Sequence, residues 1–259
     1  MTDNQPKPTL TDWIRIVDAR LHLNMSRQQM HCFALYGQML RDWNRRINLT
    51  AILDDEGIAI RHFLDSLTLV PILDRLAATH RRQLSLIDVG SGAGFPGLPI
   101  KIARSSIHVL LLDSLNKRIK FLDAAIGTLD LAGISTRHAR AEDAAHQPDL
   151  RERFDVAAAR AVASLPVLCE YCLPFVRVGG VFLAMKGQDD EEETAAAERA
   201  IQVLGGRLAE TGRFNLPGTD MKRTIVTIEK IAATPAAYPR KAGKPERDPI
   251  KNTGLIHSG

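Results

Sequence analysis

The chain has 259 residues, of which 45% are hydrophobic and 25% are charged. These fractions are typical of a globular protein and exclude a disordered chain, a coiled coil and a collagen-like fibre. At about 150 residues per domain, the length predicts one large domain or one domain with an extension. Lys and Arg outnumber Asp and Glu by 34 to 30, which gives a net charge of +4. This mild basic excess permits nucleic-acid binding but does not prove it.

The longest apolar runs, such as Val109–Leu112, fall far short of the ~20 residues that a membrane span needs. The N-terminus does not have the charged and then apolar layout of a signal peptide, so we expect a cytoplasmic protein. Three cysteines, an odd number, argue against a disulfide framework. Cys169 and Cys172 form one C-x-x-C pair without the second pair of ligands that a structural zinc requires. We therefore expect two thiols facing the core, and no metal.

The first 80 residues are predicted to form a helical extension. Residues 10–23 and 26–46 have helical patterns, and in the second of them apolar residues recur at three- and four-residue steps. Ser26 is a suitable N-cap for that helix. Asp54 and Asp55 open a further helical stretch.

Strands and helices alternate from residue 84 onwards. Strands are predicted at Leu84–Gly90, Ile107–Asp113, Ile134–Ala139, Phe154–Arg160, Gly180–Lys186, Arg207–Phe214 and Thr224–Ile231. Helices are predicted at Pro99–Arg104, Lys117–Leu129, Ser164–Val176 and Asp189–Leu204. This alternation predicts an α/β domain over residues 81–231, with a mostly parallel seven-stranded sheet and helices on both faces. The last two strands, joined by a Pro-Gly loop, are expected to pair antiparallel, and residues 232–259 to form an extended basic tail containing prolines.

A glycine-rich loop, Asp88-Val-Gly90-Ser-Gly92-Ala-Gly94-Phe95-Pro-Gly97, follows the first predicted strand. Glycines permit positive φ and let a ligand lie against bare backbone. Ligands of such sheets bind beyond the carboxyl ends of the strands. Dinucleotide-binding proteins have similar loops, but here Phe95 stands where their third glycine would be. Asp88 would repel a pyrophosphate, and it suits a cofactor with a cationic end such as S-adenosylmethionine.

Acidic residues also follow the second and third predicted strands. Asp113 can accept the hydroxyl protons of a ribose, which indicates a nucleoside without fixing its identity. Ala141-Glu142-Asp143 follows the third strand, where an acid and backbone N–H groups can contact the edge of an adenine. The alternative for the two acids is an ordinary acidic first turn of a helix.

Several longer segments resemble one known family, the GidB or RsmG family of bacterial 16S rRNA guanine-N7 methyltransferases. The similar segments, in chain order, are DVGSGAGFPGLPIKIA, LLDSLNKRIKFL, ARAEDA, FDVAAARAVASL and FLAMKG. LRDWNRRINLTA and RHFLDSL are similar to the family's N-terminal signature, and YPRKAGKPERDPI to its C-terminal one. The resemblance covers roughly residues 30–250 and implies a Rossmann-like class I methyltransferase fold.

The resemblance also implies a cofactor and a substrate. It places S-adenosylmethionine contacts at Gly90, Phe95, Ala141, Glu142 and Arg160. The predicted cofactor site is completed by residues of the loop and the second strand, namely Asp88, Gly92, Gly94 and Asp113. The implied substrate is a guanine in the decoding region, the 530 stem-loop, of 16S rRNA, with the small ribosomal subunit as partner. The family pattern often has a serine before the arginine at position 160, where this chain has Ala159.

Guanine N7 carries a free lone pair, so its methylation requires no general base. The sequence agrees by omission, because ARAVASLP does not match the Asn/Asp-Pro-Pro-aromatic motif for exocyclic amines and no Pro-Cys dipeptide occurs. Arg160 and Lys186, at the ends of the fourth and fifth predicted strands, are the predicted catalytic residues. Arg160 can donate to guanine O6 or to the methionine carboxylate, and Lys186 to a phosphate or the base. The alternatives are a structural ion pair for Arg160 and a solvated side chain for Lys186.

Two basic stretches are predicted to contact RNA. The first is at Arg45 and Arg46, and the second comprises the tail residues Arg240, Lys241, Lys244 and Arg247. Basic residues among prolines suit a segment that follows the phosphate backbone, although a charged run can also be a merely solvated face. Because A-form RNA hides N7 in its major groove, the target guanine is expected in a loop, a bulge or a distorted helix. No exposed apolar stripe is evident, so we expect a monomer.

Two other functions remain open at this point. A small-molecule methyltransferase on the same fold would leave the basic tail and the helical extension without a role. In a non-catalytic nucleoside-binding or RNA-binding protein, the complete set of Asp88, the glycine loop, Asp113 and Glu142 would have no role. Retention of the cofactor separates the second alternative from the other functions, and a salt-dependent affinity for RNA separates the first.

Overall fold

The computed structural model describes residues 7–160, 163–187 and 191–251. The strands are β1 (Ser85–Val89), β2 (His108–Asp113), β3 (Ile134–His138), β4 (Phe154–Arg160), β5 (Val176–Lys186), β6 (Gly206–Asn215) and β7 (Lys222–Lys230). The helices before the sheet are α1 (Leu10–Leu21), α2 (Arg27–Asn44), α3 (Asp55–Gly57), the π-helix η1 (Ile58–Leu64), α4 (Asp65–Leu67) and α5 (Val70–His80). The later helices are α6 (Gly97–Ala103), α7 (Asn116–Thr128), α8 (Ala141–Ala144), α9 (Leu165–Cys172), the 3-10 helix η2 (Leu173–Phe175), α10 (Glu191–Val203) and α11 (Lys244–Arg247). Asp189, the predicted start of a helix, lies outside the described residues, as do residues 1–6 and the tail residues 252–259.

The seven strands form one sheet in the order β3-β2-β1-β4-β5-β7-β6. Neighbours from β3 to β5 are parallel, whereas β7 is antiparallel to both β5 and β6. The predicted mostly parallel sheet with an antiparallel final hairpin is therefore confirmed. The strand order reverses between β1 and β4, and ligands of such sheets bind at the carboxyl ends of strands beside this switch point.

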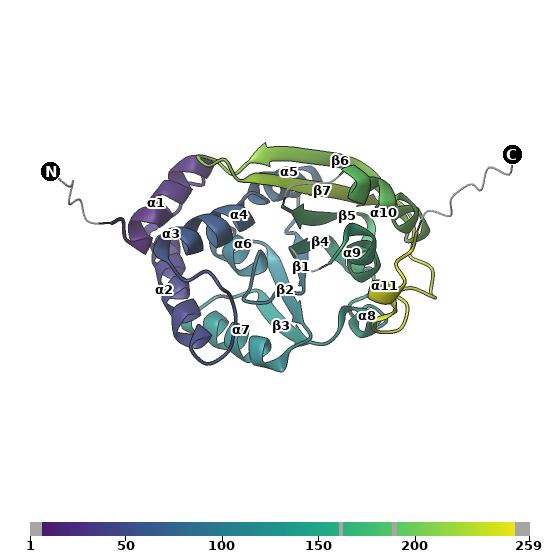
Figure 1. The fold of residues 1–259 in the computed structure, drawn as a ribbon, viewed down its shortest axis with the longest axis horizontal. Helices are drawn as coiled ribbons and strands as arrows, with labels where there is room; N and C mark the ends of the chain where they lie inside the picture. The colour runs from purple at the N-terminus through teal and green to yellow at the C-terminus, as the bar shows by residue number, and fades with distance from the viewer. Residues whose placement is uncertain (1–6, 161–162, 188–190, 252–259) are drawn as a thin grey trace, which may run out of the picture.

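Helices cover both faces of the sheet, as Figure 1 shows. Successive residues of β1 point to opposite faces, so Leu86 joins the core under α2, α6 and α7, and Ile87 joins the core under α8, α9 and α10. Because both faces are buried, the central strands are apolar throughout rather than alternating. Cys169 and Cys172 are buried free thiols in the second of these cores, as predicted.

The N-terminal helices begin at well-formed caps. Thr9 starts α1 and Ser26 starts α2, each with a capping box, so the predicted N-cap at Ser26 is confirmed. Residues 55–67 are helical, as expected from their apolar spacing, but their middle turns form the π-helix η1. The sequence pattern did not predict this π-helix, a rare conformation that is frequent at functional sites.

Two boundaries differ from the prediction in one region. The predicted helix 164–176 ends as an α-helix at Cys172, and β5 begins at Val176 instead of Gly180. Gly179, with φ +83°, and Gly180 lie inside β5, where its register with β4 shifts between Phe154 and Val156. The two glycines accompany an irregularity within the strand.

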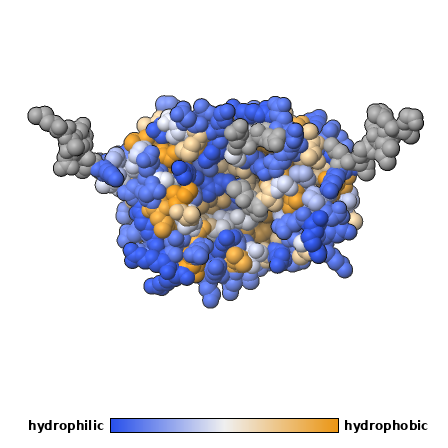
Figure 2. Space-filling model, viewed as in Figure 1, coloured by the Kyte–Doolittle hydropathy of each residue, from blue (hydrophilic) through white to orange (hydrophobic). Residues whose placement is uncertain are grey.

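The last described residues pack against α8 and α9 (Figure 1) and include the short helix α11. The sequence predicted an extended surface segment. The segment is held by residues that are distant in the chain, and such contacts leave no periodic pattern in its own sequence. Arg151, for example, donates to the carbonyl oxygens of Thr234 and Tyr238. Figure 2 shows mainly hydrophilic surface on the face of Figure 1, with smaller apolar patches.

Candidate active site

The glycine loop leaves β1 at the switch point and uses left-handed backbone. Gly90, Gly92 and Gly94 have φ of +75°, +59° and +97°, which side chains rarely tolerate. A Cβ on Gly92 would meet only the carbonyl oxygen of Gly90, at 3.9 Å. A Cβ on Gly94 would lie 2.6 Å from a Leu98 methyl carbon and 2.9 Å from the Tyr36 hydroxyl. Gly92 therefore borders open space, whereas Gly94 is required for packing.

Asp113, at the end of β2, ties the loop to its neighbouring strand. One carboxylate oxygen accepts the Gly92 N–H at 2.8 Å, and the other accepts the Leu115 N–H at 2.8 Å. Arg118 approaches the same carboxylate at 3.3 Å. The side chain is buried, so these donors fix the direction of the carboxylate.

A first cleft of about 140 Å³ lies beside this carboxylate. It brings together Gly90, Asp113, Ala141 and Glu142, which the sequence predicted as one site. Glu142 is buried in α8 and accepts a hydrogen bond from the Gly243 N–H at 2.9 Å. The three strand ends thus meet at one edge of the sheet, as expected for parallel neighbours.

Asp88 lies beneath the loop and does not line the first cleft. Its side chain is fully buried, and one oxygen accepts the Gly97 N–H at 2.9 Å. The other oxygen has no hydrogen-bond partner among the described residues. Burial raises the pKa of Asp88 to about 7, and the Gly97 N–H opposes that rise. A buried carboxyl with one oxygen that lacks a hydrogen-bond partner is well suited to interact with a positive charge bound near the loop.

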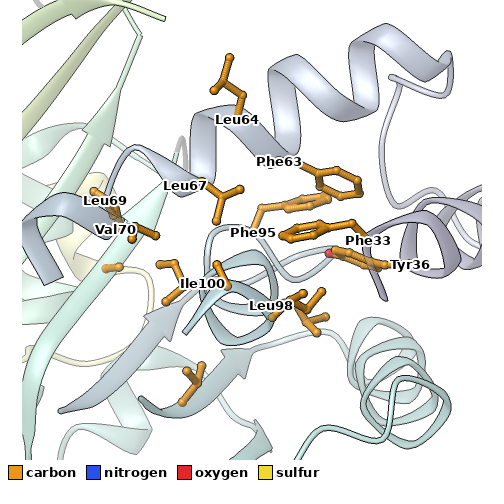
Figure 3. Close-up of a cluster of buried hydrophobic side chains, with 14 of the residues drawn as sticks. Phe33, Tyr36, Phe63, Leu64, Leu67, Leu69, Val70, Phe95, Leu98 and Ile100 are labelled. Atoms are coloured by element: carbon orange, nitrogen blue, oxygen red, sulfur yellow. The ribbon is translucent and has the colours of Figure 1, made fainter. Parts of the chain in front are cut away.

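Phe95 belongs to an aromatic stack that joins the loop to the N-terminal helices (Figure 3). It is buried and stacks on His62 with ring centroids 4.4 Å apart. Tyr36 and Phe63 pack around it, and the Tyr36 hydroxyl donates to the carbonyl of Ala93 in the loop. Phe95 does not line the first cleft, so its predicted cofactor contact stays a prediction.

A second cleft, of about 320 Å³, lies between η1 and the adjacent ends of β4, β5 and β7. Its cationic lining residues are Arg61, Arg160, Lys186 and Arg223. Arg160 ends β4, and its guanidinium carbon lies 4.9 Å from the centroid of the Phe95 ring in the glycine loop. This cation–π contact links the second cleft to the loop.

Asp65 organises two of these cations. One oxygen lies 3.3 Å from Arg160 Nη1, and the other lies 2.9 Å from Arg223 Nε. Arg160 Nη1 also donates to the carbonyl of Arg61. The Asp65 side chain is 8% exposed, so the carboxylate is a buried counterion shared by two arginines.

His62 completes this cluster in the neutral form. Arg160 Nη2 approaches His62 Nδ1 at 3.4 Å, and a guanidinium can only donate, so Nδ1 is the acceptor. His62 Nε2 therefore carries the proton and donates to Thr50 Oγ1 at 2.9 Å. Burial, reinforced by the charge of Arg160, lowers the pKa of His62 to about 3.

Lys186 is held at the edge of the second cleft. Its Nζ donates to Glu193 in α10 at 2.8 Å and to the carbonyl of Ala163 at 3.1 Å. The same Glu193 oxygen accepts the Leu165 N–H at the start of α9. Lys186 is thus an anchored lysine with a fixed partner, which differs from the solvated side chain considered as an alternative.

The predicted RNA contacts differ in their surroundings. Arg45 and Arg46 are exposed at the end of α2. Lys241, Lys244 and Arg247 are exposed around α11. Arg240 instead forms a two-pronged ion pair with Glu170, at 2.9 Å from Nε and 2.7 Å from Nη2. Glu170 is 1% exposed, so Arg240 neutralises a buried carboxylate.

Sequence reasoning missed several lining residues of the two clefts, namely His62, Asp65, Arg223, Gly243 and Glu246, and two residues that contact the site, Tyr36 and Thr50. A signal was present for two of them, because His62 and Asp65 are polar residues three positions apart, at helical spacing, within a mainly apolar helical stretch. The others carry no local signal, since their role depends on residues far away in the chain.

Two absences hold for residues 7–160, 163–187 and 191–251. No group of three or more His, Cys, Asp or Glu side chains is placed to hold a metal ion. No helix of this part of the chain is long and apolar enough to cross a membrane.

Comparison with solved structures shows the fold. The bifunctional kinase-methyltransferase WbdD aligns with a TM-score of 0.53 and 18% identity, over 74% of this chain and 46% of that chain. At this identity the likeness concerns the fold alone.

Comparison of sequences shows the family. A family model described as GidB, rRNA small subunit methyltransferase G, matches residues 29–221. The ribosomal RNA small subunit methyltransferase G of Acetivibrio thermocellus is 50% identical over 88% of this chain and 91% of its own length. The protein of the same name from Clostridium beijerinckii is 46% identical over 88% of this chain and 94% of its own length. With relatives this similar over most of both chains, and with the expected loop at the switch point of the sheet, this protein belongs to the family of rRNA small subunit methyltransferase G.

Proposed function

We propose that this protein transfers the methyl group of S-adenosylmethionine to N7 of a guanine in the 530 stem-loop of 16S rRNA. The observation that carries the proposal is the second cleft beside the glycine loop, which four cationic side chains line and where Asp65 pairs with two of them. A positive cleft suits both RNA phosphates and the acceptor atoms of guanine. The relatives' names support the small-subunit rRNA as substrate. The N7 position and the stem-loop rest on the resemblance of the sequence motifs.

S-adenosylmethionine fits the first cleft by the chemistry of its lining. Asp113 presents a fixed carboxylate of the kind that accepts ribose hydroxyls, and Gly92 leaves open space where a side chain would project. The unpartnered oxygen of Asp88 lies under the same loop. We assign Gly90, Gly92, Asp113, Ala141 and Glu142 to holding the cofactor. When bound, the cofactor supplies an electrophilic methyl group on a sulfonium.

The residues of the second cleft are proposed to orient the guanine without removing a proton. N7 has a free lone pair, and in-line displacement requires chiefly that N7 and the methyl group be aligned, an effect worth up to ~7–11 kcal/mol. The described groups support this: both oxygens of Asp65 are in ion pairs, and His62 is neutral with Nδ1 already accepting. Neither is a free base.

Arg160 and Lys186 are the proposed catalytic residues. The Arg160 guanidinium lies over Phe95 at the loop, where it can donate to guanine O6 or to the methionine carboxylate. Lys186 ends the adjacent strand β5 and can contact a phosphate or the base. We propose that Arg45, Arg46, Lys241, Lys244 and Arg247 contact RNA, and that Arg240 acts structurally through Glu170. We further propose that the protein works as a monomer in the cytoplasm.

Labelled S-adenosylmethionine and small subunits lacking N7 methylation provide the test. After incubation with the full-length protein, the labelled nucleotide is mapped in 16S rRNA. We expect label on one guanine N7, and loss of label with Arg160→Ala. Arg207→Ala is the matched control, because Arg207 lies on the edge strand β6 and forms an exposed ion pair with Glu229 of β7. Circular dichroism checks that both variants are folded.

Two results would overturn parts of the proposal. Binding of S-adenosylmethionine without label on subunits or free rRNA would refute the RNA substrate and favour a small molecule. Failure of the folded protein to bind S-adenosylmethionine would refute the cofactor assignment, and with it the methyl transfer.

A further inference from the structure

The C-terminal segment, residues 232–251, is fastened to the sheet domain by buried polar contacts. Arg240 holds Glu170 of α9 through both its guanidinium and its backbone N–H. Thr234 is buried, and its N–H donates to Glu152 at 2.7 Å. His146 contacts the carbonyl of Pro239 at 2.8 Å. Contacts to three separate regions give this segment a defined position, unlike a free basic tail.

Beyond Arg240 the segment reaches the first cleft. Gly243 takes the left-handed conformation, with φ +76°, and its N–H donates to Glu142 Oε1 at 2.9 Å. Glu142 is 5% exposed, so this is a charge-assisted hydrogen bond in a nearly buried setting. Figure 1 shows α11 beside α8, although the residues that bond are 101 positions apart in the chain.

The segment also forms part of the lining of the first cleft. Gly243 and Glu246 border the same space as Gly90 and Asp113, together with Tyr171 of α9. Tyr171, Glu142 and Glu246 line this cleft together. Burial raises the pKa of the Tyr171 hydroxyl, and the two carboxylates raise it further. The lining therefore combines a ring, hydrogen-bond acceptors and bare glycine backbone.

We propose that residues 243–246 are part of the cofactor-binding site and form one wall of the cleft that takes the adenosine half of S-adenosylmethionine. This inference rests on the cofactor assignment of the proposed function. The adenine ring presents a flat apolar surface and an exocyclic amine that donates hydrogen bonds. The Glu246 carboxylate and the Tyr171 ring offer an acceptor and a surface for these groups. The family model ends at residue 221 and does not include these residues.

A linkage follows from this arrangement. A ligand that binds the docked state of the segment more tightly than the undocked state shifts the equilibrium toward the docked state. The size of the shift is set by the difference between the two affinities. Cofactor binding should therefore hold residues 243–246 in place, and loss of their contacts should weaken cofactor binding. The linkage is reciprocal, so both directions can be measured without following methyl transfer.

Hydrogen exchange and calorimetry on the full-length protein test the proposal. S-adenosylhomocysteine is the probe, because it retains the adenosine half and cannot react. We expect it to slow amide exchange in residues 243–247. We expect Glu246→Ala and Gly243→Ala each to weaken its binding by about tenfold, as for a lost charge-assisted hydrogen bond. An alanine at Gly243 has no atom nearer than 3.9 Å, so it acts through backbone strain rather than a clash. Lys251→Ala, an exposed change on the same segment, is the matched control.

The outcomes distinguish a failure of the proposed wall from a failure of the proposed function. If the wild-type protein binds the probe, but residues 243–247 exchange as before and Glu246→Ala binds normally, the wall is refuted and the proposed function stands. If the wild-type protein binds neither S-adenosylhomocysteine nor S-adenosylmethionine, the cofactor assignment fails, and this inference fails with it. Glu246 is exposed, so Glu246→Ala should have the melting temperature of the wild-type protein. If Gly243→Ala does not fold, binding of the probe to Glu246→Ala tests the proposed wall.

Discussion

Replacing Asp65 with Asn should destabilise the fold strongly, because one carboxylate serves two arginines. The side chains of Arg160 and Arg223 are 16% and 21% exposed, and each lies within 3.3 Å of an Asp65 oxygen. Breaking a fully buried ion pair costs ~3–5 kcal/mol, since the remaining charge stays buried without a partner. The partial exposure of both guanidiniums reduces this, and we expect a loss of about 2–3 kcal/mol in the free energy of unfolding.

Urea denaturation at neutral pH measures this loss. The matched control is Asp74→Asn, because Asp74 is 47% exposed and pairs with Arg104 at 2.8 Å. Removing an exposed ion pair of this kind should lower the free energy of unfolding by at most ~1 kcal/mol. Arg223→Met in the Asp65→Asn background should recover part of the stability, since it removes one unpaired charge. Equal losses for the two asparagine variants would refute the reasoning that Asp65 is a buried shared counterion.

Three further predictions concern pH and backbone. The folded-state pKa of His62, about 3, lies below its ordinary 6.5, so the free energy of unfolding should fall on acidification below pH 6.5, by about 2 kcal/mol at pH 5. Denaturation at pH 7 and pH 5 measures this fall, which should be smaller for His62→Gln. An equal fall in the variant and the wild-type protein would contradict the assignment. Because the pKa of Asp88 is about 7 and a cationic cofactor favours the carboxylate, calorimetry should show S-adenosylmethionine binding strengthen from pH 6 to pH 8, with Asp88→Asn removing that dependence. If Asp88→Asn keeps the wild-type pH dependence, another group is responsible. Gly205→Ala should lower the melting temperature, because its Cβ would lie 2.2 Å from the Ala232 carbonyl oxygen and Gly205 has φ +80°. Gly127→Ala in α7 meets nothing within 4 Å and should raise the free energy of unfolding by about 0.5–1 kcal/mol. Equal melting temperatures of the two variants would contradict this prediction.

Much of the fold could be predicted because its signals are local. The runs that became β1 and β2 are short, apolar and bounded by Gly90 and Asp113, as expected for strands buried on both faces. The missed boundary at Val176 and the missed π-helix η1 have a common cause. In both places the chain departs from regular geometry in a folded context, whereas periodicity describes only regular elements.

The two clefts were predictable to different degrees. The first cleft is built mainly from residues at the ends of successive strands, so the glycine loop, Asp113 and Glu142 could be assigned together. Its wall at Gly243 and Glu246 could not, because that segment has no periodic pattern. The second cleft depends on Asp65 and Arg223, which are 158 positions apart. Sequence reasoning found Arg160 and Lys186 there without the residues that hold them.

By itself the sequence determined the order of the strands along the chain, the glycine loop and the basic character of the C-terminal segment. Only the tertiary structure decided which charges meet. Arg240 was predicted to contact RNA, and it pairs with Glu170, 70 positions earlier. A charge taken out of water must find a partner, and the partner is whichever group lies close in space. Short apolar runs and turn residues are encoded locally, whereas the pairing of buried charges depends on how the whole chain packs.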